Sequence, residues 1–208
     1  MPKHLFTKVL LSIAALLGVV ATATAQQAVD PNRTHIFFSA GCADCWPYTE
    51  DVLIPALQDQ GAATNPEIHD YTRPEERTRL LQLADEIALP RSIADSLYAF
   101  VPTSNGTLVV LGHVPPSLIE AALTSPDVPA RLVLWQPEMH GDPTEYRLWA
   151  WAGEVQTFAI STPFAEALPQ ALTAAGPLPT GLANLGQLLP GFILSGVLAS
   201  VSPCTIAV

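Results

Sequence analysis

The sequence predicts a mixed α/β fold, with one sheet whose strands alternate with helices. The β-branched and aromatic run at residues 34–38 is typical of a buried strand. Residues 74–89 carry a proline at their start and leucines at helical spacing, which is typical of an amphipathic helix. Asn105-Gly106 lies between two apolar runs and is a strong signal for a β-hairpin. These patterns predict the order βαβαββα.

The first half of this pattern begins with the strand at residues 34–38. A Ser-Ala-Gly break follows it, and a helix is predicted from about residue 42 to residue 58. Pro55 falls within that helix and should kink it, because proline removes one backbone donor. A second strand is predicted at residues 67–71, ahead of the helix at residues 74–89.

The second half is the hairpin and the helix after it. Apolar runs at residues 96–101 and 107–114 are predicted to pair as antiparallel strands. A helix then opens at Pro115 or Pro116 and continues to residue 123.

A β-rich appendage is predicted beyond this helix, over residues 126–166. Its three strands, joined by turns that contain Pro, Gly and Asp, are expected at residues 131–136, 145–151 and 154–160. The appendage is rich in aromatic side chains, namely Trp135, Tyr146, Trp149 and Trp151. Alternating aromatic residues fit either a surface that binds a partner or part of the core, and the sequence leaves both open.

The first 25 residues are typical of a cleaved secretory signal peptide. Lys3 and Lys8 precede an apolar run at residues 9–20, and the small-x-small pattern Ala23-Thr24-Ala25 closes the segment. An uncleaved membrane anchor is the alternative, but the run is shorter than the roughly 20 residues that a span needs. We therefore expect an exported chain whose mature form begins at Gln26 and whose domain lies on the extracytoplasmic, periplasmic side.

The C-terminal part is uncharged after Glu166. Residues 188–208 are apolar and, as a helix, would reach about 31 Å, enough to cross a hydrocarbon core of about 30 Å. A buried C-terminal helix is the alternative, but Gly191 and Gly196 favour close helix contacts in lipid. We predict a transmembrane segment at residues 188–208, reached through a Pro-, Ala- and Gly-rich linker at residues 167–187. Because this span ends without a polar tail, we expect it to be the first of several in a longer membrane protein.

The acidic charge balance restricts the partners. The formal net charge is −10, and loss of Lys3 and Lys8 with the signal peptide would lower it to −12. Such a chain is not expected to bind nucleic acid or an anionic membrane surface. Residues 26–166 have the length of one domain, at residues 26–125, with a modest appendage, and one core is expected.

The chemistry is predicted at Cys42-Ala43-Asp44-Cys45, directly after the first strand and at the start of a helix. The unpaired amides and the positive end of the helix dipole stabilise a thiolate there and lower its pKa. Cys42, nearer the helix end, is expected to be the attacking thiol. Cys45 is expected to resolve the mixed disulfide. Export would place the pair where disulfides persist.

A strand, a CxxC at a helix start, a proline later in that helix and a following βαββα pattern together resemble the thioredoxin fold, over about residues 34–123. Thioredoxin-like proteins exchange disulfides through such a pair. The resemblance therefore implies a catalytic role for Cys42 and Cys45 in a thiol–disulfide oxidoreductase that acts on a protein partner. The alternative is a non-catalytic, membrane-tethered interaction module in which the disulfide is only structural.

Two positions depart from the family pattern. Most members carry a cis-proline immediately before the third strand, and residues 93–96 contain none. Pro102 follows that strand and leads into the hairpin, so it is not expected to replace the missing proline. Asp44 places a carboxylate between the cysteines, which should oppose thiolate formation and destabilise the reduced form. We therefore expect a reductant or electron carrier, unless Asp44 is screened by water.

The apolar segment near the C-terminus is similar to the first membrane segment of the DsbD and CcdA family, whose members carry electrons across the membrane to extracytoplasmic thiols. The similarity lies in Ser202-Pro203-Cys204, late in a helix of small and apolar residues. It implies that Cys204 is half of a membrane redox site, in a relay for cytochrome c maturation or disulfide reduction. An apolar cysteine that serves only as a small hydrophobic residue is the alternative.

The histidines raise the possibility of a metal site, for instance that of a copper chaperone. His35 and His69 are predicted on the first and second strands, and nothing in the sequence places either ring beside Cys42. His113 and His140 are the other candidates, and strand and loop histidines usually have no such role. We therefore predict neither a bound metal nor a cofactor.

Overall fold

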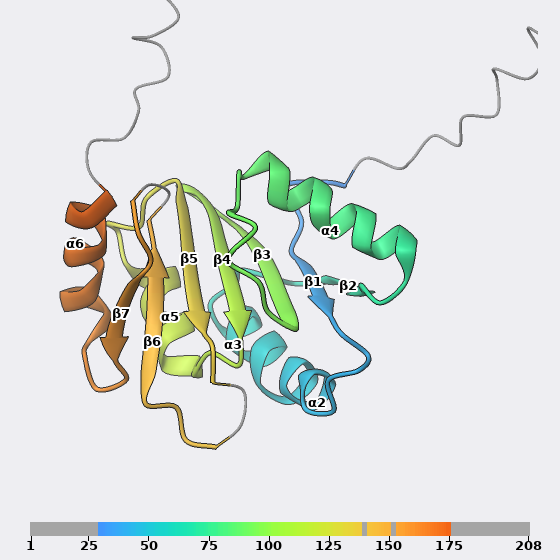
Figure 1. The fold of residues 1–208 in the computed structure, drawn as a ribbon, viewed down its shortest axis with the longest axis horizontal. Helices are drawn as coiled ribbons and strands as arrows, with labels where there is room; N and C mark the ends of the chain where they lie inside the picture. The colour runs from blue at the N-terminus through green and yellow to red at the C-terminus, as the bar shows by residue number, and fades with distance from the viewer. Residues whose placement is uncertain (1–28, 139–140, 151–152, 176–208) are drawn as a thin grey trace, which may run out of the picture. The chain divides into compact units, whose positions relative to one another are not determined.

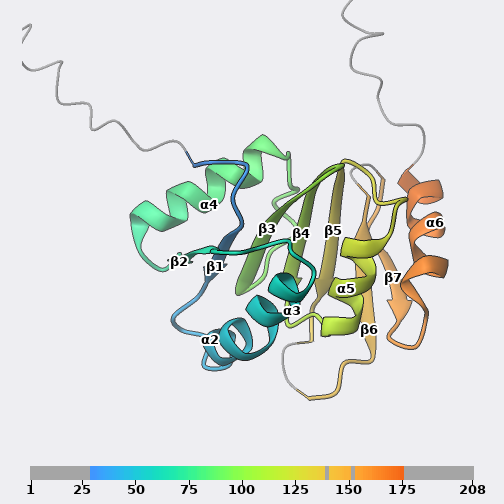
Figure 2. The same ribbon diagram turned by 180° about the vertical axis from the view of Figure 1, so that it is seen from behind.

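The computed structural model describes residues 29–138, 141–150 and 153–175. Residues 31–175 contain a seven-stranded mixed sheet with strand order β2-β1-β3-β4-β5-β6-β7. Figure 1 shows α4 over one face of this sheet, and Figure 2 shows α3 and α5 on the opposite face. The predicted mixed α/β fold is confirmed.

Strands are found at every place where the sequence predicts one. They are β1 (His35–Phe38), β2 (Glu67–Asp70), β3 (Leu97–Thr103), β4 (Gly106–Gly112), β5 (Arg131–Gln136), β6 (Glu145–Trp149) and β7 (Gln156–Ala159). The helical elements are α2 (Cys45–Tyr48), the π-helical turn η2 (Thr49–Leu53), α3 (Ile54–Asp59), α4 (Pro74–Glu86), α5 (Pro116–Thr124) and α6 (Phe164–Ala175).

Strand directions in the first part of the sheet follow from the connections. β1 pairs parallel with β2, across a helical connection, and antiparallel with β3. β3 and β4 form the hairpin predicted from Asn105-Gly106, with Thr103 opposite Gly106. An alanine at Gly106 would place its Cβ 1.9 Å from the carbonyl oxygen of Ala130, so this turn requires glycine. The arrangement from β1 to α5 is consistent with a thioredoxin-like fold.

The predicted appendage extends the same sheet. β5 pairs parallel with β4, and β6 and β7 continue with antiparallel pairing. Tyr146 and Trp149 are buried, which places both in the core. The strands therefore share a hydrophobic core with the first part of the domain.

The first helix begins at Cys45, three residues later than predicted, and contains a π-helical turn where the sequence predicts a kink. The N–H of Ile54 donates to the carbonyl of Thr49, five residues back. This hydrogen-bonded turn therefore contains one more residue than an α-helical turn. Pro55, which has no N–H to donate, follows this turn at the start of α3. The proline is thus accommodated at a change of helical register, and helical structure continues to Asp59.

The linker prediction is wrong for residues 167–175, which belong to α6. This helix packs against β6 and β7 and buries four side chains at helical spacing: Phe164, Ala167, Leu168 and Ala171. Pro169 lies inside the helix but points to an exposed side. Burial of this apolar stripe, together with the high helix propensity of its alanines, outweighs the cost of Pro169 inside the helix.

Several predictions fall outside the described residues. These are the signal peptide at residues 1–25, the rest of the linker at residues 176–187, the membrane segment at residues 188–208 with Cys204, and His140 and Trp151. Within the described part of the chain, no helix is long and apolar enough to span a membrane.

The main core lies between the sheet and the helices α3, α5 and α6. It runs without interruption from Ile36 on β1 to Ala171 on α6. Its fully buried large side chains include Leu53, Leu57, Leu97, Leu108, Ile119, Leu132, Leu134, Tyr146 and Leu148. This core holds α2 and α3 against the sheet and so fixes where the cysteine pair lies.

Candidate functional site

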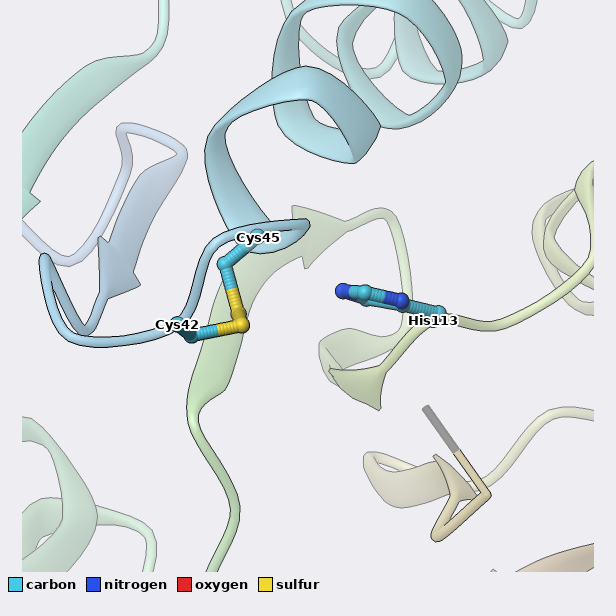
Figure 3. A group of neighbouring side chains, drawn as sticks. All are labelled: Cys42, Cys45 and His113. Atoms are coloured by element: carbon cyan, nitrogen blue, oxygen red, sulfur yellow. A yellow bond between two sulfur atoms is a disulfide. The ribbon is translucent and has the colours of Figure 1, made fainter. Parts of the chain in front are cut away.

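Cys42 and Cys45 form a disulfide at the C-terminal end of β1 (Figure 3). Their sulfurs are 2.07 Å apart and their Cα atoms 5.4 Å apart. Cys42 lies in the turn before α2 and is partly exposed, whereas Cys45, the first residue of α2, is fully buried. Of the two sulfurs, a partner can reach that of Cys42 more easily, which is the asymmetry predicted for an attacking and a resolving cysteine.

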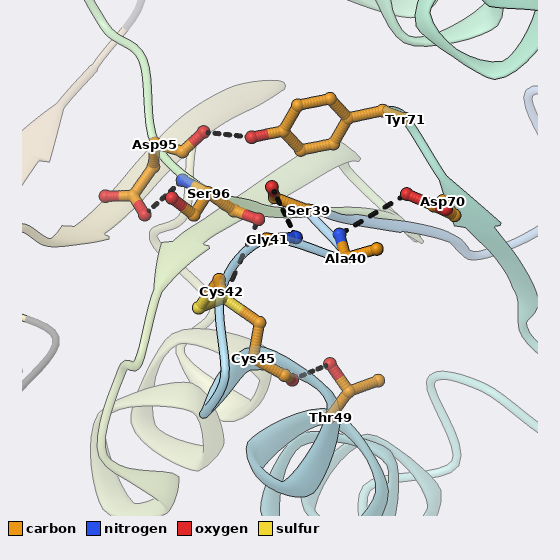
Figure 4. The surroundings of a disulfide bond; sticks show 10 residues. All are labelled: Ser39, Ala40, Gly41, Cys42, Cys45, Thr49, Asp70, Tyr71, Asp95 and Ser96. Carbon is orange, nitrogen blue, oxygen red and sulfur yellow. Dashed lines mark hydrogen bonds between the residues drawn. A yellow bond between two sulfur atoms is a disulfide. The ribbon is translucent and has the colours of Figure 1, made fainter. Parts of the chain in front are cut away.

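The turn that carries Cys42 is fixed by hydrogen bonds, and Figure 4 shows the one between Ala40 and Asp70. The N–H of Cys42 donates to the carbonyl of Ser39 (2.9 Å), and the N–H of Ser39 donates to the carbonyl of Ser96 (2.9 Å). Asp70 accepts a hydrogen bond from the N–H of Ala40 (3.3 Å). Because the turn is anchored to both neighbouring strands, Cys42 has a defined position.

The loop before β3 faces the disulfide, at the place where most thioredoxin-like proteins carry a cis-proline. Here Ser96 presents its carbonyl oxygen 3.8 Å from the sulfur of Cys45. No cis peptide bond occurs among the described residues, and Pro102 lies within β3, opposite Thr107. In the reduced state the Cys45 thiol is placed to donate to the Ser96 carbonyl.

His113 is the residue of the site that the sequence analysis missed. One of its ring nitrogens and both cysteine sulfurs lie within 4.8 Å of one another (Figure 3). The ring stacks on Tyr48, with centroids 4.5 Å apart and planes at 18°. The Tyr48 hydroxyl donates to the carbonyl of Val114 (2.5 Å), and burial raises the pKa of Tyr48, so this hydroxyl stays protonated.

The topology explains why His113 meets the cysteines. β1 and β4 are both antiparallel to β3, so their C-terminal ends lie at the same edge of the sheet. Cys42 follows β1 and His113 follows β4. Gly112, with φ of +71°, turns the chain at the end of β4, and a Cβ there would lie 2.1 Å from the carbonyl oxygen of Gln136. The sequence signal was therefore a histidine near the C-terminal end of the strand predicted at residues 107–114, which runs parallel to the first.

Asp95 contributes a partly buried carboxylate beside this group. Its Oδ2 accepts a hydrogen bond from Trp135 Nε1 (2.8 Å), and its Oδ1 accepts one from the N–H of Ser96 (2.6 Å). Burial raises the pKa of Asp95 above its usual value. The hydrogen-bond donors and the nearby His113 oppose this shift only in part. Trp135 thus connects β5 to the loop that faces the disulfide.

The exposed surface around the pair is acidic and aromatic. Asp44 is exposed at the N-cap of α2, where its side chain makes no capping hydrogen bond. Trp46 is 42% exposed although it is a large apolar side chain, and its ring lies 5.4 Å from that of Phe38. An exposed indole beside a partly exposed disulfide is suited to contact a partner protein.

Comparison with known proteins identifies no relative. No protein-family model matches the chain. Neither a curated protein nor a solved structure matches it. The geometry of the site is therefore the basis for inferring what this chain does.

The other histidines lie elsewhere. His35 and His69 are brought together on β1 and β2, and neither groups with the cysteine pair. His140 and Cys204 lie outside the described residues.

Proposed function

We propose that this protein is a thiol–disulfide oxidoreductase that exchanges electrons with a protein partner. The supporting observation is the asymmetric pair: a partly exposed Cys42 bonded to a fully buried Cys45 at the start of a helix. A purely structural disulfide has no need of this asymmetry, nor of a histidine beside it.

In the reducing direction, the Cys42 thiolate attacks one sulfur of a partner's disulfide. A bond forms between Cys42 and the partner, and the other partner sulfur leaves as a thiolate that takes up a proton. The Cys45 thiolate then attacks the Cys42 sulfur, re-forms the Cys42–Cys45 bond and releases the second partner thiol. The pair loses two electrons, and a dithiol of a donor protein restores them.

His113 is placed to accept the proton of a cysteine thiol. A ring nitrogen within 4.8 Å of both sulfurs can take this proton when the thiolate forms and return it to a leaving sulfur. The stacked Tyr48 ring holds the imidazole in orientation. His113 therefore acts as the acid–base group of the exchange.

The cellular setting is the second part of the proposal. The features of residues 1–25 and 188–208 support an exported, membrane-attached protein that receives or delivers electrons in a relay like that of DsbD and CcdA. Cys204 would supply one thiol of the membrane part. The acidic Asp44 favours a reductant in this relay.

The first prediction concerns the two single-cysteine variants, made in the full-length chain with Cys204→Ser so that the pair alone reacts. Cys45→Ser should accumulate a mixed disulfide at Cys42 with a small aromatic disulfide. Cys42→Ser should react at least about tenfold more slowly, because the Cys45 sulfur is buried. Stopped-flow absorbance of the released thiol gives both rates, and peptide mass spectrometry identifies the modified cysteine.

Titration of the Cys204→Ser chain in glutathione buffers separates catalysis from a structural role. The pair should exchange freely, with a midpoint more reducing than glutathione if it serves as a reductant. A pair that stays oxidised in millimolar reduced glutathione would establish the alternative, an interaction module with a structural disulfide.

A further inference from the structure

A second cluster of titratable side chains lies at the opposite end of β1 from the cysteines. His35 and Phe37 on β1 pair with Glu67 and His69 on β2, so all four side chains project from the same face of the sheet. β2 is the edge strand. The cluster is independent of the cysteine chemistry proposed above.

Three potential ligand atoms of this cluster face one another. Nδ1 of His35 and Nε2 of His69 are 3.2 Å apart. Oε2 of Glu67 lies 3.6 Å from Nδ1 of His35 and 3.9 Å from Nε2 of His69. An ion equidistant from all three would lie about 2.1 Å from each, within the roughly 2.0–2.2 Å of zinc bonds to imidazole nitrogen and carboxylate oxygen.

The ligand atoms belong to side chains that are already ordered. His35 and His69 are 1% and 6% exposed. The Phe37 ring stacks on that of His69, with centroids 4.5 Å apart. Glu67 is partly exposed, so an ion can reach the cluster from solvent on that side.

A second carboxylate orients one of the histidines. Oε2 of Glu76 on α4 lies 2.8 Å from Nδ1 of His69, which directs the proton to Nδ1 and leaves Nε2 with a lone pair for a metal. Glu76 therefore fixes the orientation of the His69 ring and the nitrogen that it presents to the cluster.

Two arginines balance the negative charge around the cluster. Arg33 Nη1 lies 2.5 Å from Oε1 of Glu67 and leaves Oε2 directed at the histidines. Nη1 of Arg79 lies 3.4 Å from Oε1 of Glu76. The ligand set is thus two imidazoles and one carboxylate, with a position left for water, as in open zinc sites.

We propose that His35, Glu67 and His69 bind a divalent transition-metal ion, with Zn²⁺ the ion that best fits their spacing. The ion replaces the proton shared between His35 Nδ1 and His69 Nε2, and His35 then carries its proton on Nε2. Binding ties the edge strand β2 to β1. Glu76 is a positioning residue, which acts through His69.

The test uses tag-free full-length protein carrying Cys204→Ser, with the Cys42–Cys45 pair kept oxidised so that no thiolate competes. Zn²⁺ is titrated in competition with a chromophoric chelator, and Co²⁺ absorption reports ligand number. Wild-type protein should bind one equivalent, and Glu67→Gln and His69→Ala should weaken binding at least about 100-fold. Glu76→Gln should weaken it about 10- to 100-fold.

Matched variants keep the result interpretable if His69→Ala fails to fold. Glu75→Gln, the exposed neighbour of Glu76 on α4, and His113→Ala at the cysteine pair should bind Zn²⁺ as wild type does. Zn²⁺ should also raise the Tm of the wild type but not that of Glu67→Gln. Absence of stoichiometric binding to the wild type, or unchanged affinity in Glu67→Gln and Glu76→Gln, would overturn the proposal and leave a hydrogen-bonded histidine pair.

Discussion

His113 and Asp95 show how single residues from distant parts of the chain complete the cysteine site. His113 comes from the end of β4 and Asp95 from the loop before β3, and they are electrostatically coupled. Because the thiolate is the reactive form of cysteine, a neutral imidazole nearby can draw the proton away at a pH below the usual thiol pKa. The pH dependence of exchange should therefore report on His113.

His113→Ala should slow the reaction of the reduced pair with a model disulfide by about 10- to 100-fold at neutral pH. Its rate should then rise only as the thiol itself deprotonates, near a pKa of about 8.5. Rates measured from pH 5 to pH 9 test this. Tyr48→Phe, which keeps the stacked ring but loses the hydroxyl, is the control and should retain the wild-type profile. An unchanged profile in His113→Ala would remove the histidine from the mechanism.

At the scale of elements, the site depends on how β4 ends. Gly112 adopts a left-handed conformation and lies against the backbone of β5, which lets the chain bend so that His113 reaches the cysteines. Gly61 also has a positive φ, but nothing lies within 4 Å of where its Cβ would be. An added side chain would meet both backbone strain and a steric clash at Gly112, but only backbone strain at Gly61.

Gly112→Ala should lower the free energy of unfolding by at least about 3 kcal/mol, because strain and a backbone clash combine. Gly61→Ala should cost only about 1–2 kcal/mol, from the left-handed conformation alone. Urea denaturation of both variants gives the comparison. If both variants lost the same free energy of unfolding, β4 and β5 would be able to move apart and relieve the clash without loss of stability.

At the scale of the whole molecule, residues 31–175 form one sheet and one continuous main core. β5 pairs with β4 along its full length, and Trp135 on β5 is hydrogen-bonded to Asp95 in the loop at the site. Helix α6 covers β6 and β7 and contacts α5. The strands after α5 therefore support the loop that faces the cysteine pair and should unfold together with it.

Leu168→Ala on α6 should lower the free energy of unfolding by about 2–5 kcal/mol and leave a single transition, because Leu168 is 1% exposed. Leu81→Ala, on an exposed side of α4, should cost less than about 1 kcal/mol. Tryptophan fluorescence and circular dichroism should give the same urea midpoint for each variant. A separate early transition in Leu168→Ala would show that residues 126–175 fold independently.

Local sequence determined the elements and the position of the cysteines. The β-branched runs, the proline-initiated helices and Asn105-Gly106 each act through short-range conformational preference, so they predict strands, helices and the hairpin directly. The CxxC follows a strand, and this order alone places it at an end of the sheet. The spacing of Phe164, Ala167, Leu168 and Ala171 also carried a helical signal, which the prolines of this segment obscured.

Tertiary structure alone decided which side chains meet. Strand pairing brings His113 to the cysteines and His35 to His69, across separations in sequence that no local pattern spans. The same pairing joins β5 to β4, where the sequence alone allowed a separate appendage. The physical reason is that a side chain's neighbours across a sheet depend on strand order and register, which the burial of the whole apolar surface selects at once.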